Sequence, residues 1–96
     1  MIQMLCRNRV RDFAVWKRVF DSHADRHRRA GLKLVRLWRA TENPDNVFFL
    51  FDADDIQKAR AFISTPEAAE AGKISGVLDG EYHFLEAGPG YGNTRS

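Results

Sequence analysis

Two histidines, His23 and His27, stand four residues apart in a stretch whose pattern predicts a helix. This spacing places both imidazoles on one helix face. Because an imidazole titrates near neutral pH, such a pair could transfer protons. It could also bind zinc if a third ligand, such as His83, Cys6 or a carboxylate, came close. Nothing in the sequence brings one there, so we expect no metal and no cofactor.

The two histidines continue an apolar stripe. Phe13, Trp16 and Phe20 lie on the same predicted helix face, and the stripe changes to imidazole in its last two turns. Polar groups are tolerated only where water or ligand satisfies them, so this change predicts the mouth of a pocket. We expect His23 to act as acid or base there, and His27 to lie further out and more exposed. In the alternative interpretation, the helix end leaves the core and both imidazoles are hydrated.

A second group that could handle a proton or an oxyanion follows near residue 82. Tyr82 and His83 are neighbours in a predicted strand, so they point to opposite faces and only one can share a pocket with His23. A His23–Tyr82 pair could deprotonate a phenol or an activated methylene and hold the oxyanion. We therefore take His23 and Tyr82 as candidate catalytic residues. The candidate substrate-binding residues are Trp16, Phe20, His27, Trp38 and Phe62; Trp38 could instead line a seam between subunits.

The elements that must position these residues alternate along the chain. Patterns of apolar residues and capping signals predict strands at 2–10, 32–41, 47–51 and 81–87, and helices at 13–30, from Asp54 or Asp55 to 64, and at 66–74. With right-handed crossovers, this order predicts an α+β fold, a ferredoxin-like β-α-β-β-α-β sandwich. Its four-stranded antiparallel sheet would have the strand order 4-1-3-2. We assign residues 1–88 to this single domain and 89–96 to a flexible or partner-contacting tail.

The strand "VFFLF", residues 47–51, is apolar on both faces. Such a strand is usually central and covered on both sides. Helices cover only one face of a ferredoxin-like sheet, so a second copy of the same sheet would have to cover the other. We therefore expect a homodimer.

Composition narrows the class of protein. Residues 1–39 carry eleven Lys and Arg against three Asp, whereas residues 40–96 carry four against ten Asp and Glu. The basic residues are scattered, so we expect the halves to complement each other in the fold and to bind no nucleic acid. Arg36 and Arg39, on opposite faces of their predicted strand, should pair with carboxylates of the acidic half. No apolar run is long enough to span a membrane and no leader pattern opens the chain. With its single cysteine, Cys6, these features predict a cytoplasmic protein without membrane contact.

Three stretches together resemble a known superfamily: "DFAVWKRVFDSHADRHRRAGL", "RATENPDNVFFLFDADD" and "KARAFISTPEAAEAGKISGV". They are similar to small bacterial proteins of the dimeric α/β-barrel superfamily, related to antibiotic-biosynthesis monooxygenases and polyketide cyclases. The resemblance implies a ferredoxin-like protomer, a dimer whose sheets form a barrel, and a ligand cavity between helices and sheet.

We therefore expect a cofactor-independent enzyme for a hydrophobic, aromatic or polyketide-like small molecule, such as a cyclase, isomerase or monooxygenase, with His23 moving a proton. The alternative is a small-molecule-binding or regulatory homodimer without catalysis. The sequence contains no phosphate-binding loop, nucleophile motif or dinucleotide fingerprint.

Overall fold

The computed structural model describes residues 2–86, so the tail predicted at 89–96 lies outside the described residues. The elements follow one another as β1 (Ile2–Val10), α1 (Phe13–Ser22), α2 (Ala24–Arg29), β2 (Leu32–Arg39), β3 (Asn46–Ala53), α3 (Ile56–Ile63), α4 (Pro66–Ile74) and β4 (Val77–Glu86). The strands form one antiparallel sheet in the order β2-β3-β1-β4. This is the predicted 4-1-3-2 order, so the ferredoxin-like fold is confirmed.

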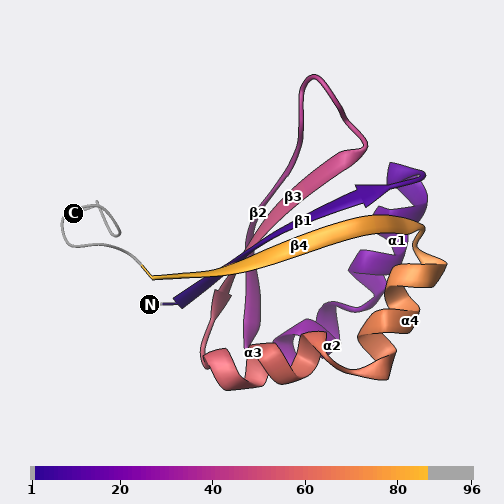
Figure 1. The fold of residues 1–96 in the computed structure, drawn as a ribbon. Coiled ribbons are helices and arrows are strands. Elements are labelled where there is room, and N and C mark those ends of the chain that lie inside the picture. The colour runs from indigo at the N-terminus through magenta and orange to yellow at the C-terminus, as the bar shows by residue number, and fades with distance from the viewer. Residues whose placement is uncertain (1, 87–96) are drawn as a thin grey trace.

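The helices gather on one side of the sheet (Figure 1). Local signals explain where they begin: the side chains of Asp12, Asp55 and Thr65 accept hydrogen bonds from backbone N–H groups in the first turns of α1, α3 and α4. Gly31, predicted to end the first helical region in a left-handed conformation, has a φ of 76°.

The predicted helix 13–30 is divided in two. His23 closes α1 and opens α2 with φ of −101° and ψ of 13°, outside the helical range. The sequence contains no proline or glycine at this point, so the break was not predicted. It changes the direction in which the residues of α2 face.

The last strand is longer than predicted. It begins at Val77, directly after Gly76, which has a φ of 80°, and pairs with β1 from Val10 onward. Gly80, directly before the predicted start of the strand, lies inside it.

The covered face of the sheet carries the core. Alternate residues of β1 and β3 are buried there, together with Trp16 from α1 and Ala59 from α3. The buried strand residues are Met4, Cys6 and Val10 of β1, Leu32 of β2, and Val47, Phe49, Phe51 and Ala53 of β3. β3 lies between β2 and β1, which confirms the central position predicted from its apolar sequence.

The opposite face of the sheet has both apolar and paired charged side chains. Trp38 pairs with Phe48 on this face and is 42% exposed. Arg7 lies 3.2 Å from both Asp79 and Glu81, and Arg9 also contacts Asp79. Here the basic half of the chain complements the acidic half, as predicted.

Not every arginine follows that prediction. Arg36 and Arg39 do lie on opposite faces of the sheet, because Arg36 pairs with Leu50 and Arg39 with Val47. Arg39 was expected to pair with a carboxylate. Its guanidinium instead donates to the carbonyl oxygen of Pro44 (3.1 Å) and lies 4.2 Å above the Phe13 ring. The prediction was wrong there because an aromatic face and a loop carbonyl lie nearer to this edge of the sheet.

Candidate functional site

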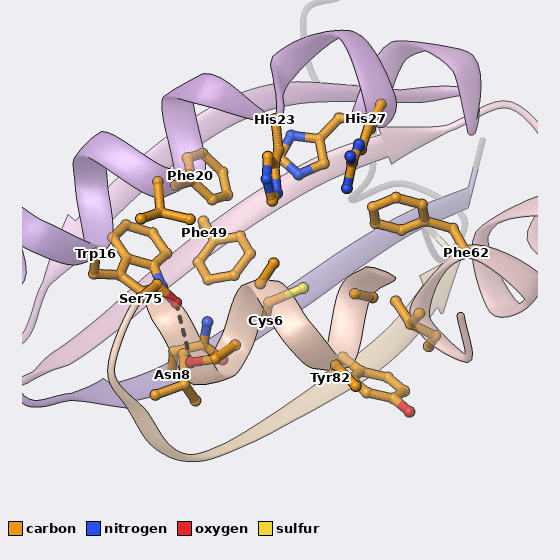
Figure 2. A pocket seen from close by; sticks show the side chains of 18 of the residues that line it. Cys6, Asn8, Trp16, Phe20, His23, His27, Phe49, Phe62, Ser75 and Tyr82 are labelled. Atoms are coloured by element: carbon orange, nitrogen blue, oxygen red, sulfur yellow. Dashed lines mark hydrogen bonds between the residues drawn. The ribbon is translucent and has the colours of Figure 1, made fainter. Parts of the chain in front are cut away.

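A cavity of about 290 Å³ lies between the covered face of the sheet and the helices. Figure 2 shows its roof formed by α1 and α2, its floor by the sheet, and Tyr82 on the side opposite the histidines. Aromatic rings dominate its walls: Trp16 stacks on Phe20 at 4.7 Å between ring centroids, and both contact Phe49. Such a lining suits a flat apolar ligand.

The cavity brings together all but one of the site residues named from the sequence: His23, Tyr82, Trp16, Phe20, His27 and Phe62 all line it. Trp38 does not. Its pairing with Phe48 places it on the far side of the sheet, where it cannot reach a ligand in this cavity. Of the two positions considered for Trp38, a cavity wall or a subunit seam, only the second is compatible with this face.

Tyr82, and not His83, shares the cavity with His23. Tyr82 pairs with buried Cys6, on the covered face. His83 pairs with Leu5 and its Nε2 lies 3.2 Å from a carboxylate oxygen of Glu81. The strand register therefore resolves the alternative that the sequence left open.

His27, and not His23, is the more enclosed of the two imidazoles, contrary to the expectation. His27 packs against Phe20, Phe51 and Phe62, with ring centroids at 5.0, 5.2 and 5.7 Å. Burial, and next the charge of His23, lower the pKa of His27 to about 4. Among residues 2–86, the His23 ring has no comparable aromatic contact. The expectation that His27 would be the wetter residue was wrong because it assumed one straight helix, whereas the break at His23 turns α2 back over the cavity.

Sequence reasoning missed Asn8. The Asn8 amide is assigned the orientation that satisfies both of its polar atoms: its oxygen then accepts a hydrogen bond from Trp16 Nε1 (3.2 Å), and its nitrogen donates to the carbonyl oxygen of Arg7 (3.1 Å). Gly80 lies opposite Asn8 on β4, and a Cβ there would come within 2.5 Å of the Asn8 amide. The glycine thus leaves room for the group that fixes the indole in the cavity wall. A polar residue at an inward position of β1 was the one available signal.

Cys6 contributes no thiolate to the site. It lies in the cavity floor, and burial raises the pKa of its thiol to about 12. Within the described part of the chain, histidine, cysteine and acidic side chains nowhere gather in threes that could hold a metal ion. His83 and the His23–His27 pair are on different faces of the sheet.

Comparison with known proteins gives structural matches only. No protein-family model and no curated protein matches the chain. A candidate antibiotic biosynthesis monooxygenase from Bordetella bronchiseptica superimposes with a TM-score of 0.74 at 18% identity, over 90% of this chain and 95% of that one. One from Caulobacter crescentus gives 0.70 at 16%, over 90% and 88%. An uncharacterised NIPSNAP domain protein from Burkholderia xenovorans gives 0.66 at 13%, over 94% and 97%.

These structural matches establish the fold of the chain. The chain has a ferredoxin-like fold, as its sequence resemblance implied, and its structural neighbours include proteins described as antibiotic biosynthesis monooxygenases. Identities this low establish the fold and do not transfer an activity, which depends on the site. In residues 2–86, no helix has the length and apolar character needed to cross a membrane.

Proposed function

We propose that the protein is a small cofactor-independent enzyme that acts on a hydrophobic, aromatic or polyketide-like molecule by histidine-mediated proton transfer. One observation carries the proposal: His23 and Tyr82 line opposite sides of one aromatic-walled cavity. The fold that the chain shares with candidate antibiotic biosynthesis monooxygenases supports it. The single buried cysteine is compatible with a cytoplasmic location.

In this proposal, the two polar groups have separate roles. The His23 imidazole accepts the proton of a phenol or of a methylene activated by a carbonyl group. The negative charge then rests on the substrate oxygen, to which the Tyr82 hydroxyl donates a hydrogen bond. His27 belongs to the wall, because a histidine with a pKa of about 4 is a weak base.

The fate of the carbanion would decide the type of reaction. Returning the proton to another carbon gives an isomerase, and attack on a carbonyl carbon of the same molecule gives a cyclase. A monooxygenase would use dioxygen as co-substrate, with one oxygen atom entering a new carbonyl group and the other leaving as water. All three begin with the same proton transfer, so that step is the one to measure first.

The alternative is a ligand-binding or regulatory homodimer without catalysis, and one observation favours it. Catalytic bases are usually oriented by a further polar group. Within residues 2–86, the His23 ring has no hydrogen-bond partner that would orient it. The same cavity would then bind its ligand without moving a proton.

We also propose that the uncovered face of the sheet pairs with a second copy of the chain. Half-buried Phe48 and Leu50 of the central strand lie there beside exposed Trp38. Apolar side chains on an open sheet face favour burial against another sheet. Neither sheet would then contribute to the other's cavity, which lies on the helix side.

Binding and catalysis can be tested separately. The proposal expects 2-naphthoate, a flat two-ring probe, to bind saturably by its own fluorescence, and Trp16→Ala to weaken binding about tenfold or more. 2-Tetralone, a two-ring ketone with an activated methylene, should exchange its methylene protons with solvent faster when the protein is present under anaerobic conditions. Binding without catalysed exchange would select the alternative function. Absence of probe binding would contradict both.

A further inference from the structure

A second cavity, of about 210 Å³, lies beside the first. It opens between α2 and the edge strand β2, and Leu32, Lys33 and Leu34 line its strand side. The two cavities share three lining residues: Phe20, His27 and Phe51. These three side chains therefore form a partition, with one cavity on each side of it.

His27 is the member of the partition that comes from α2. Its ring lies 5.0 Å from the Phe20 ring and 5.2 Å from the Phe51 ring, whereas those two phenyl rings are 6.1 Å apart. The imidazole thus lies within contact distance of both phenyl rings. Removing the imidazole would join the two cavities into one space lined by aromatic rings.

The imidazole is an unusual choice for this place. A neutral imidazole carries one N–H donor and one acceptor nitrogen, and an apolar surrounding satisfies neither. In the part of the chain that the structure describes, no protein group forms a hydrogen bond with the His27 ring nitrogens. A phenyl ring would fill the same space without that cost, so the position fits a group that faces a ligand better than one that only fills the core.

The partition limits the volume that is available to a ligand. Binding cavities for small molecules usually have volumes of about 300–1,000 Å³. The first cavity alone is at the lower end of this range, whereas both together would lie well within it. We infer that His27 is a specificity-determining residue: it limits the proposed ligand to about two fused aromatic rings and keeps the second cavity closed to it.

This inference rests on the proposed function, because it concerns the ligand of the same cavity. The rim of the second cavity adds a feature that a longer ligand would meet. Arg28 and Lys33 line it, with Asp21 as the acidic residue. Because Arg28 already forms an ion pair with Asp25, Lys33 is the better placed cation for an anionic group at the far end of a longer ligand.

Two probes that differ by one fused ring test the inference: 2-naphthoate and anthracene-2-carboxylate. We expect the wild-type protein to bind 2-naphthoate at least tenfold more tightly. His27→Ala should reduce this preference at least tenfold by admitting the longer probe. His27→Phe is the matched control, because a phenyl ring keeps the partition and should keep the preference. The preference is a ratio of dissociation constants, so the fraction of active protein does not affect it.

Four results would overturn the inference. The first is an unchanged preference in His27→Ala, and the second is loss of the preference in His27→Phe. If the wild-type protein binds 2-naphthoate but shows no preference, the inference fails while the proposed cavity stands. If it binds neither probe, the proposed function fails and the inference fails with it. Should His27→Ala not fold, as judged by circular dichroism, His27→Val removes most of the ring and carries the same test.

Discussion

With the Asn8 amide in the orientation that its neighbours require, the indole Nε1 of Trp16 donates a hydrogen bond to the Asn8 side-chain oxygen across 3.2 Å, joining α1 to β1 in the cavity wall. Trp16 is 2% exposed, so this hydrogen bond satisfies a donor that water cannot reach. The same bond fixes the largest ring of the cavity wall. Gly80 makes it possible by leaving space beside the Asn8 amide.

Gly80→Ala should therefore destabilise the protein. The new Cβ would come within 2.5 Å of the Asn8 amide and 3.0 Å of the Arg7 carbonyl oxygen, so the Asn8–Trp16 bond would be lost or the strands would shift. We expect a loss of about 1–3 kcal/mol in the free energy of unfolding, measured by urea denaturation.

Gly72→Ala is the matched control for that substitution. Gly72 lies within α4, and its nearest neighbour would be Val77 Cβ at 4.0 Å, an ordinary contact. Because alanine favours a helix over glycine by about 1 kcal/mol, this variant should be as stable as the wild type or more so. Equal stability of Gly80→Ala and Gly72→Ala would contradict the role given to Gly80.

The buried His27 should make stability depend on pH. Its pKa is about 4 in the folded protein against about 6.5 unfolded, so the unfolded chain binds more protons between these values. Stability is therefore retained above about pH 6.5 and falls as the pH drops toward 4. From pH 7.5 to pH 5, the full pKa difference would correspond to a loss of about 2 kcal/mol; because His27 is only half-buried and solvent screens it, we expect a loss of about 1 kcal/mol.

Comparing the wild type with His27→Phe isolates this effect. The two proteins should differ in their loss of stability between pH 7.5 and pH 5, with the smaller loss in the variant. Urea denaturation at both pH values measures it. Identical losses would show that the His27 pKa is not lowered in the fold.

The proposed dimer makes a prediction about mass. Light scattering at micromolar concentration should give about twice the 11.0 kDa of the chain. Leu50→Glu places a charge in the middle of the uncovered sheet face and should yield monomers. Leu34→Glu is the control, since Leu34 is 42% exposed but pairs with Phe51 toward the helix side. A wild-type monomer, or equal dissociation by both variants, would contradict the proposed pairing.

Charge pairing within the fold predicts weak nucleic-acid binding. Arg7 and Arg9 are occupied by Asp79 and Glu81, so these arginines add little to any basic surface. Gel-shift titration with mixed-sequence DNA and RNA at moderate salt should show only weak binding. Tight binding that falls steeply with salt would overturn this expectation.

Much of the fold could be predicted from local signals. Alternation along β1, the apolar sequence of β3 and the caps at Asp12 and Thr65 depend on near neighbours, which a sequence displays directly. Six of the seven named site residues line one cavity because helical and strand periodicity placed them on inward faces.

What could not be predicted depends on contacts between distant residues. No proline or glycine marks the helix break at His23 in the sequence. This break makes His27 the more enclosed imidazole. The Asn8–Trp16 bond and the space at Gly80 exist only once β1, α1 and β4 are packed together. The sheet face that Trp38 occupies could not be predicted, because the register of β2 against β3 shifts between Leu34 and Arg36.

The most direct measurement for the central claim follows the proton itself. 2-Tetralone, which has two fused rings, is held with protein in deuterated buffer without oxygen, and loss of the signal of its activated methylene protons is followed by nuclear magnetic resonance. Wild-type protein should accelerate the exchange, and His23→Gln should reduce the acceleration at least about 100-fold, as expected for loss of a general base. The 2-naphthoate dissociation constant should change by less than about threefold, because the aromatic walls remain. Exchange by His23→Gln at the wild-type rate would contradict the assignment of His23 as the residue that moves the proton.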